Sequence, residues 1–319
     1  MLALRAHTFD GPAGLSLDEV PERAGPERGL SVRVAVHAAG VGFVDAQLTR
    51  GQFECVTTSP VTPGLEISGE VTSAPSGCGF SVGDRVVGHV MTGGFAEVAW
   101  VRPDMLAPLP RELSFVQGAA VVVNFHTALL ALSRAQLRAG ESVLVHGAGG
   151  GLGSAVVAVA TALGARVVGV AGSSEREDVA WAAGARDVCG PDDWSAAVSA
   201  AGGVDVVVDP VGGEVFEESL YCLAPEGRLI TVGATSSVLG KAPSAQLLRR
   251  GSTVMGLLWT EALARDRTLF GRAAKQLDDL VAGGLRPIIG GTYDLAEGAD
   301  ALRAIENRTA SGKLVLTIG

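Results

Sequence analysis

The stretch Glu141-Ser-Val-Leu-Val-His-Gly-Ala-Gly-Gly-Gly-Leu-Gly153 decides the fold of this chain. Residues 142–145 predict a short apolar strand, and the Ala- and Val-rich residues 154–163 predict a helix. The turn between them has almost no side chains, so a pyrophosphate can approach its backbone. The helix N-terminus adds free N–H groups and a partial positive charge. The sequence therefore predicts the start of a βαβ unit that binds a dinucleotide.

The glycine pattern of this turn is Ala-x-Gly-x-x-Gly, with Ala148 where the usual pattern has its first glycine. Gly150 removes a side chain from the path of the pyrophosphate, and Gly153 lets the helix pack close to the strand. A second strand at residues 165–170 follows at the distance that a dinucleotide fold requires. The alternative is an ordinary glycine-rich loop in another α/β fold.

Composition narrows the class of protein. The chain has 319 residues, 47% of them apolar, and a net charge of −9. The length favours two domains, and the acidic balance argues against a nucleic-acid partner or an anionic membrane surface. No uncharged apolar run is long enough to span a membrane, and residues 1–10 lack the apolar core of a signal peptide. Four scattered cysteines have neither disulfide-framework nor zinc-knuckle spacing. We therefore expect a cytoplasmic protein.

The pattern along the chain predicts an α/β protein with two domains. Short strands separated by Gly and Pro fill residues 1–117 and predict a barrel-like β-rich domain. Strands and helices alternate over residues 118–259, which predicts a doubly wound parallel sheet. Residues 260–319 no longer follow this alternation and are expected to return to the first domain. Within these regions we expect a helix break near Asn124 and one amphipathic helix over residues 261–282.

The end of the second predicted strand indicates which dinucleotide is bound. An acidic residue there would bind the ribose 2′-hydroxyl of NAD, but the position is Gly172. Ser173, Ser174 and Arg176 follow, and two hydroxyls with a guanidinium suit a 2′-phosphate, which favours NADPH. In the alternative interpretation Ser174 caps the next helix, Arg176 is solvated, and Glu175 approaches a ribose.

Several motifs together make the chain similar to a known family. It resembles the zinc-independent quinone oxidoreductases (zeta-crystallin type) of the medium-chain dehydrogenase/reductase superfamily, nearly end to end. The resemblance implies a GroES-like catalytic domain and a Rossmann domain. The motifs that carry it are Ala38-Ala-Gly-Val-Gly-Phe-Val-Asp45, Pro63-Gly-Leu-Glu-Ile-Ser-Gly-Glu-Val71, Gly83-Asp-Arg-Val86, Gly93-Gly-Phe-Ala-Glu-Val98, Val143-Leu-Val-His-Gly-Ala-Gly-Gly-Gly-Leu-Gly153 and Ser311-Gly-Lys-Leu-Val-Leu316.

The same resemblance implies that the protein works without zinc. Zinc-dependent members place a cysteine near residues 42–45 and a Gly-His-Glu where this chain has Gly64-Leu65-Glu66. Both ligands are missing here, which leaves Glu66 without a metal to serve, and His89 and His126 cannot form a ligand set alone. We therefore expect no metal. The resemblance implies that hydride passes from NADPH to an acceptor whose developing charge is held by hydrogen bonds.

Family cofactor contacts can be carried over by position. Residues 150–153 match the pyrophosphate turn, and Thr127 and Gly233 match positions on the nicotinamide side. The full set of implied cofactor contacts is Thr127, Gly150, Gly151, Leu152, Gly153, Ser173, Ser174, Arg176, Gly233, Asn307 and Lys313. Three usual polar residues are replaced, by Gly42, Phe53 and Gly190, so the predicted active site has few polar groups.

The remaining candidates concern the chemistry itself. Asp45 is a candidate to bind substrate or ribose, or else a first-turn helix residue satisfied by backbone N–H groups. His126 is a candidate proton donor, or else a histidine packed inside. Phe53, Phe125 and Trp259 are expected to line an apolar substrate pocket, unless they are simply core residues.

The sequence thus favours an NADPH-dependent, zinc-independent reductase of a quinone or a conjugated enone or enoyl acceptor. One alternative is an enoyl reductase of a biosynthetic pathway, and another is a non-catalytic NADPH-binding protein of the same family. We also expect a homodimer in which residues 252–258 pair across a two-fold axis, because this apolar strand would otherwise be an exposed edge. The substrate expected is a small molecule.

Overall fold

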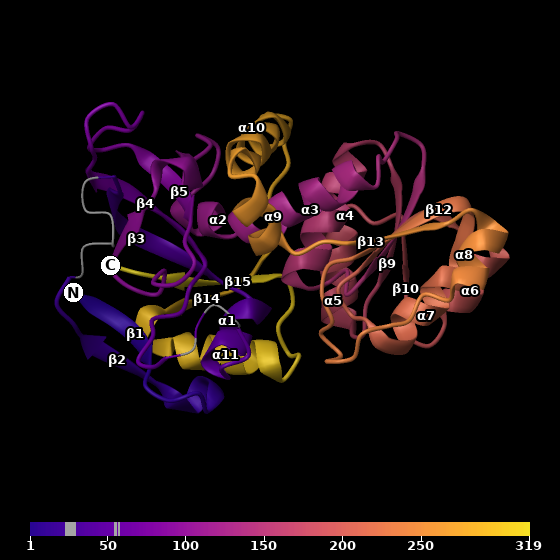
Figure 1. Cartoon of the computed structure of the whole chain (residues 1–319), viewed down its shortest axis with the longest axis horizontal. Helices are drawn as coiled ribbons and strands as arrows, with labels where there is room; N and C mark the ends of the chain where they lie inside the picture. Colours follow the sequence, from indigo (N-terminus) through magenta and orange to yellow (C-terminus); the bar gives the residue numbers. More distant parts are fainter. Residues whose placement is uncertain (23–29, 54–55, 57) are drawn as a thin grey trace. The chain divides into compact units, whose positions relative to one another are not determined.

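The computed structural model describes residues 1–22, 30–53, 56 and 58–319. The chain divides into two compact units. Figure 1 shows the chain coloured along its sequence, from indigo at the N-terminus to yellow at the C-terminus. Unit 1 consists of Met1–Val123, Arg267–Ala282 and Ile289–Gly319, and unit 2 of Asn124–Asp266 and Gly283–Ile288. The predicted domain borders, after residues 117 and 259, lie a few residues before the borders of these compact units and remain a prediction. Both ends of the chain belong to unit 1.

Unit 1 is built on a seven-stranded sheet with the order β14-β15-β3-β4-β5-β7, with β6 pairing on β3. A separate hairpin joins β1 and β2. The strands are β1 (Leu2–Ala6), β2 (Leu15–Glu19), β3 (Val32–Val41), β4 (Glu66–Ser73), β5 (Arg85–His89), β6 (Val98–Val101), β7 (Leu106–Pro108), β14 (Ile289–Asp294) and β15 (Lys313–Thr317). The helices are α1 (Phe43–Thr49), α2 (Phe115–Ala119), α10 (Thr268–Ala282) and α11 (Gly298–Glu306), with short 3₁₀ turns at Gly11–Gly14, Pro103–Met105 and Leu295–Glu297.

Strand β3 shows why the sequence folds this way. Its valines 32, 34 and 36 alternate with other side chains, and all three are buried in the main core of unit 1. This alternation turns one face of the strand into the core. The C-terminal β15 runs antiparallel to β3 and completes this core with Leu314 and Leu316.

Unit 2 has a six-stranded sheet with the order β10-β9-β8-β11-β12-β13, and every neighbouring pair is parallel. Numbered from its first strand this order is 3-2-1-4-5-6, the doubly wound order of dinucleotide folds. The predicted fold class is confirmed. The strands are β8 (Ser142–His146), β9 (Arg166–Val170), β10 (Asp187–Cys189), β11 (Val204–Asp209), β12 (Leu223–Thr231) and β13 (Thr253–Gly256). The helices are α3 (Val122–Arg134), which begins in unit 1, α4 (Gly151–Ala162), α5 (Ser174–Ala182), α6 (Trp194–Ala200), α7 (Gly213–Cys222), α8 (Ser244–Arg250) and α9 (Trp259–Arg265).

Two predicted helix details are wrong. The break in the first helical region lies between Ala119 and Val122, so Asn124 is in the first turn of α3. A distant carboxylate accepts the N–H of Val123 and sets the helix start, which no local pattern reveals. Residues 261–282 form two helices, because Asp266 is extended (φ −145°, ψ 95°) where the chain passes between the units. Helix α8 was not predicted. No helix in the described part of the chain has both the length and the apolar character to cross a membrane.

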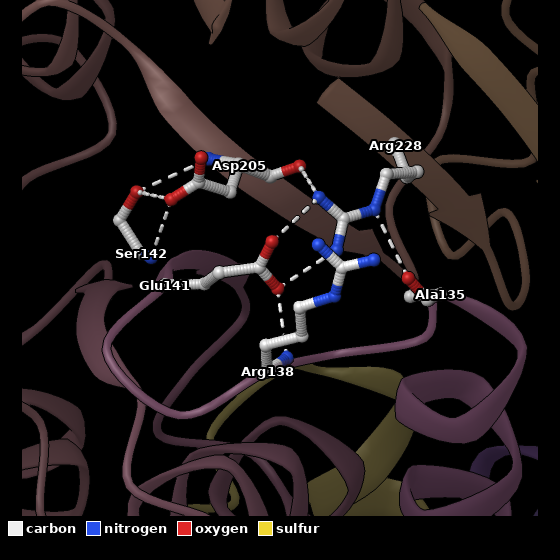
Figure 2. Close-up of polar contacts among 6 residues, drawn as sticks. All are labelled: Ala135, Arg138, Glu141, Ser142, Asp205 and Arg228. Carbon is white, nitrogen blue, oxygen red and sulfur yellow. Dashed lines mark hydrogen bonds and ion pairs between the residues drawn. The ribbon is translucent and has the colours of Figure 1, made fainter. Parts of the chain in front are cut away.

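A network of polar and charged side chains connects β8, β11 and β12 of unit 2 (Figure 2). The guanidinium of Arg228 in β12 bonds both carboxylate oxygens of Glu141, at 3.1 and 2.8 Å, and donates to the carbonyls of Ala135 and Asp205. The Asp205 carboxylate of β11 accepts from both the N–H and the hydroxyl of Ser142 in β8. These bonds link the amino ends of β8 and β11 to Arg228, which lies in the middle of β12 in register with Val206. The network lies at the opposite end of β8 from the turn that precedes α4.

Arg228→Ala is expected to lower the free energy of unfolding by about 2–3 kcal/mol, because it leaves a half-buried carboxylate and two carbonyls without their charged donor. Urea denaturation followed by circular dichroism measures this change. Arg303→Ala is the matched control: its pair with Asp300 is exposed, and its removal should cost less than about 1 kcal/mol. Equal losses in the two variants would contradict a bracing role for Arg228.

Candidate functional site

The glycine turn of unit 2 lies between β8 and the N-terminus of α4. Gly147 adopts a left-handed φ of +61°, and its carbonyl accepts the N–H of Gly150 at 2.9 Å. Gly150 is the N-cap of α4, with extended backbone and no side chain. A Cβ at Gly153 would overlap the Gly147 carbonyl, whereas one at Gly150 would meet only that carbonyl oxygen, at 3.4 Å. The predicted close packing at Gly153 and open approach at Gly150 thus have a geometric basis.

The first turn of α4 provides donors at this open position. The N–H groups of Gly151, Leu152 and Gly153 precede the first intrahelical bond of α4, which Ser154 donates to the Gly150 carbonyl. Gly151 and Leu152 are partly exposed. The helix has twelve residues, so its dipole adds a partial positive charge. These features fit a diphosphate, which needs several donors and no obstructing side chain.

The glycine turn packs directly against the residues predicted to bind the 2′-phosphate. Gly149 approaches Arg176 so closely that a Cβ at residue 149 would overlap the Arg176 backbone and Cβ. Ser173 is the N-cap of α5, and Ser174 and Arg176 lie in its first turn. Both serines are exposed and Arg176 is partly exposed. The N-termini of α4 and α5 therefore lie close together, where β8 and β9 end. The first carries Gly150–Gly153, and the second carries Ser173, Ser174 and Arg176. Neither Ser173 nor another side chain caps α5 in the structure.

A pocket of about 380 Å³ lies at the same edge of the sheet. Gly233 lines it together with the ends of β12 and β13. Its place near the nicotinamide remains a prediction. Arg134, Glu261 and Arg265 supply the charged groups of its wall. Asp209, at the end of the neighbouring β11, is buried and accepts the N–H groups of Val211 and Gly212. Burial raises the pKa of this carboxyl.

The other predicted residues of unit 2 are buried. His126 and Thr127 lie in α3, and the His126 ring faces Trp259 of α9 at 5.5 Å between centroids. Phe125 is 3% exposed and Trp259 is 4% exposed. Trp259 does not line the pocket beside Gly233.

Unit 1 contains a second group of predicted residues, centred on Asp45. This carboxylate is buried in the first turn of α1 and accepts the N–H of Gly42 at 2.8 Å and of Gly64 at 2.9 Å. Burial raises its pKa to about 7, and the two backbone donors and the Lys313 ammonium oppose that shift. Asp45 therefore joins two glycine segments, which agrees with the helix-turn interpretation of this residue.

Lys313 has a partner that the sequence did not indicate. Its ammonium, at the start of β15, forms a buried ion pair with Oε1 of Glu66. The second oxygen, Oε2, accepts the N–H of Val123 at 2.7 Å. Both carboxylate oxygens of Glu66 therefore have partners within the protein. The predicted contact of Lys313 with the cofactor remains a prediction.

The remaining candidates also lie in unit 1. Phe53 lines a pocket of about 310 Å³ with Val61 and Met91, whereas Phe125 and Trp259 belong to unit 2. Asn307 is exposed at the C-cap of α11. Over residues 1–22, 30–53, 56 and 58–319, no three His, Cys, Asp or Glu side chains form a group that could hold a metal ion. Among the same residues, Cys78, Cys189 and Cys222 are free.

Comparison with known proteins settles the family. The model of the alcohol dehydrogenase GroES-like domain matches residues 28–111, and that of the zinc-binding dehydrogenase matches residues 151–274. Quinone oxidoreductase-like protein 2 of Bos taurus is 34% identical over 95% of this chain and 89% of its own length. The chain belongs to the quinone oxidoreductase family.

Other members of the quinone oxidoreductase family support the assignment. The quinone oxidoreductase of Sus scrofa is 32% identical over 100% of this chain and 98% of its own length. The crystal structure of quinone oxidoreductase from Thermus thermophilus, described with its NADPH complex, superposes with a TM-score of 0.86 at 36% identity and covers 100% of both chains. The predicted resemblance and the combination of a GroES-like with a Rossmann domain are confirmed.

Sequence reasoning missed three residues that shape these sites. Glu66 was noted only for a missing metal, and the local pattern does not distinguish it from Glu70, an exposed acid of the same strand. Gly149 and Gly40 were not singled out. A Cβ at Gly40 would overlap Glu66 and the Ala119 carbonyl, as a Cβ at Gly149 would overlap Arg176. Glycines at such close approaches are visible in sequence but their partners are not.

Proposed function

We propose that this chain is an NADPH-dependent, zinc-independent reductase that transfers hydride to a quinone or to a conjugated enone or enoyl compound. The observation that carries the proposal is the contact between the glycine turn and the first turn of α5. The close approach of Gly149 to Arg176 brings the start of α4 near the first turn of α5, which carries Ser174 and Arg176 and follows Ser173, and this neighbourhood supports the proposal. NADPH is described in complex with the Thermus thermophilus relative.

Each part of the site has a proposed task. Gly150, Gly151, Leu152 and Gly153 would hold the diphosphate, and Ser173, Ser174 and Arg176 the 2′-phosphate. Thr127 and Gly233 would lie on the nicotinamide side, with Asn307 and Lys313 as further candidates. Bound NADPH supplies the hydride.

The acceptor needs a different environment. The pocket that Phe53 lines also has Thr58 and Thr92 in its wall, and a quinone or enone ring would pack against its apolar members, Phe53, Val61 and Met91. His126 remains a candidate for proton delivery and Asp45 a candidate to bind substrate or ribose, and both side chains are buried in the structure. Leu65 stands where a zinc ligand would be, and Glu66 is paired with Lys313, which supports chemistry without zinc.

The proposal is tested by NADPH oxidation at 340 nm against quinones, alkenals and enoyl thioesters. Turnover of quinones or alkenals supports the proposal, and a strong preference for enoyl thioesters identifies a biosynthetic enoyl reductase. Saturable NADPH binding without turnover on any acceptor would make the protein a non-catalytic NADPH binder. Absence of binding to either reduced nicotinamide cofactor would overturn the proposal.

Arg176→Ala is expected to raise the KM for NADPH at least tenfold, equivalent to about 1.4 kcal/mol, and to leave the KM for NADH within about twofold. The reason is that only NADPH carries the 2′-phosphate that the guanidinium would bind. Steady-state kinetics with both cofactors measures the difference. Arg186→Ala, in the loop before β10, is the control. An unchanged KM for NADPH would contradict the assigned pocket.

We further propose a homodimer formed through β13. This strand is an edge of the six-stranded sheet, and large apolar side chains nearby are exposed, with Leu239 at 79% and Leu248 at 86%. Light scattering at micromolar concentration is expected to give twice the chain mass of 32.4 kDa. Met255→Lys, which charges the edge, is expected to shift the protein toward the monomer. A wild-type monomer would refute this arrangement.

A further inference from the structure

Glu66 and Lys313 form an ion pair in the interior of unit 1, between the first residues of β4 and β15. Both strands pair with β3, so the ion pair spans that strand. Gly40, opposite Glu66 in β3, has no side chain, and a Cβ there would overlap the carboxylate. A buried ion pair seldom stabilises a fold more than apolar residues of equal volume would. Stability alone therefore gives little reason for this pair.

The second contact of Glu66 gives a more specific reason. Its Oε2 accepts the N–H of Val123 at 2.7 Å, one of the donors that a helix N-terminus leaves without an intrahelical partner. Val123 is the second residue of α3, and the next turn of this helix carries His126 and Thr127. The Lys313 ammonium binds the other oxygen, Oε1, and compensates the charge of this buried carboxylate.

The same ammonium also faces a third segment. A Cβ at Gly42 would lie 3.8 Å from Nζ of Lys313 and 3.7 Å from Oδ2 of Asp45. Asp45 in turn holds the N–H groups of Gly42 and Gly64. The backbone around residues 42, 64 and 123 is thus tied to one buried set of charges.

We propose that Glu66 is a positioning residue for hydride transfer. Its Oε2 holds the Val123 N–H and so orients the start of α3, and with it His126 and Thr127. Lys313 compensates the charge that the carboxylate carries in the interior of unit 1. This inference rests on the reductase activity proposed above.

Two double variants separate positioning from a purely structural role. E66M/K313M preserves side-chain length but removes the acceptor of the Val123 N–H. E66Q/K313M is also uncharged and keeps a carbonyl oxygen as the acceptor. E66M/K313M is expected to lower kcat at least tenfold with KM for NADPH within twofold of wild type, and E66Q/K313M to recover most of kcat. Rates are normalised to the concentration of NADPH-binding sites, found by fluorescence titration.

The control E141Q/R228M neutralises a different ion pair, the half-buried Glu141–Arg228 pair of unit 2. It should lower thermal stability without changing kcat. A kcat of E66M/K313M within twofold of wild type would overturn the proposal. So would an E66Q/K313M variant no faster than E66M/K313M.

Hydrogen exchange at the Val123 amide provides a readout that does not depend on turnover. Its rate is expected to rise at least tenfold in E66M/K313M and to stay near the wild-type rate in E66Q/K313M. If E66M/K313M does not fold, a tenfold faster exchange in E66Q/K313M would by itself overturn the proposal. Absence of wild-type turnover with every acceptor would refute the reductase activity. An unchanged exchange rate of the Val123 amide in E66M/K313M would instead refute the anchoring of α3 by Glu66.

Discussion

Gly153→Ala is expected to destabilise unit 2 and to abolish measurable NADPH binding. The new Cβ would overlap the carbonyl oxygen of Gly147, and it would lie 2.6 Å from the carbonyl carbon and 2.8 Å from the Cα of Ala148. These are backbone atoms of the turn itself, so the helix must move away from the strand or the turn must open. Overpacking of this kind costs about 1–3 kcal/mol or more. Urea denaturation and NADPH fluorescence titration measure the two effects.

Gly150→Ala is the matched control for this change, three residues earlier in the same turn. Its Cβ would meet only the Gly147 carbonyl oxygen, at 3.4 Å, and its φ of −90° suits any residue. We expect stability within about 0.5 kcal/mol of wild type. NADPH affinity should nevertheless fall, because the methyl group lies where the diphosphate would approach. Equal affinity for NADPH in wild type and Gly150→Ala would place the diphosphate elsewhere.

Lys313→Met is expected to lower the free energy of unfolding by about 3–5 kcal/mol, the usual cost of leaving one partner of a buried ion pair alone. Glu66 is 2% exposed, and it would have to stay charged without a counterion or take up a proton. Chemical denaturation at neutral pH measures the loss. The result also tests whether Lys313 acts within unit 1, because a residue that only contacts cofactor would leave the apoprotein stable.

Glu66→Gln and the double variant E66Q/K313M complete a thermodynamic cycle with Lys313→Met. The double variant removes both charges and should recover most of the stability that Lys313→Met loses. Additive losses in the double variant would show that Glu66 and Lys313 are not coupled, and a Lys313→Met protein as stable as wild type would show the same directly.

The parts of the fold that sequence predicted well rest on periodic or glycine signals. The turn at residues 147–153 combines a strand, missing side chains and a helix, and all three are local properties of the chain. The alternation of strands and helices over residues 118–259 predicted a doubly wound parallel sheet, whereas its 3-2-1-4-5-6 strand order comes from the structure.

The predictions that failed concern features set by contacts between residues that are far apart in the sequence. The start of α3 is set by Glu66, a residue far away in the chain, and the break at Asp266 by the passage from one unit to the other. Lys313 reads as an ordinary polar residue after Gly312, and only the sheet order places its ammonium beside Glu66. Side-chain function in unit 1 is therefore poorly predictable from local patterns.

The discontinuous make-up of unit 1 has a consequence for synthesis of the protein. Strand β15 lies between β14 and β3 in the sheet, although it leaves the ribosome after both of them. Unit 2 can complete its sheet during translation, whereas Glu66 has no counterion and β3 lacks one neighbour until residues 313–317 emerge. A nascent chain that stalls before this point would expose an unfinished sheet edge to chaperones and aggregation.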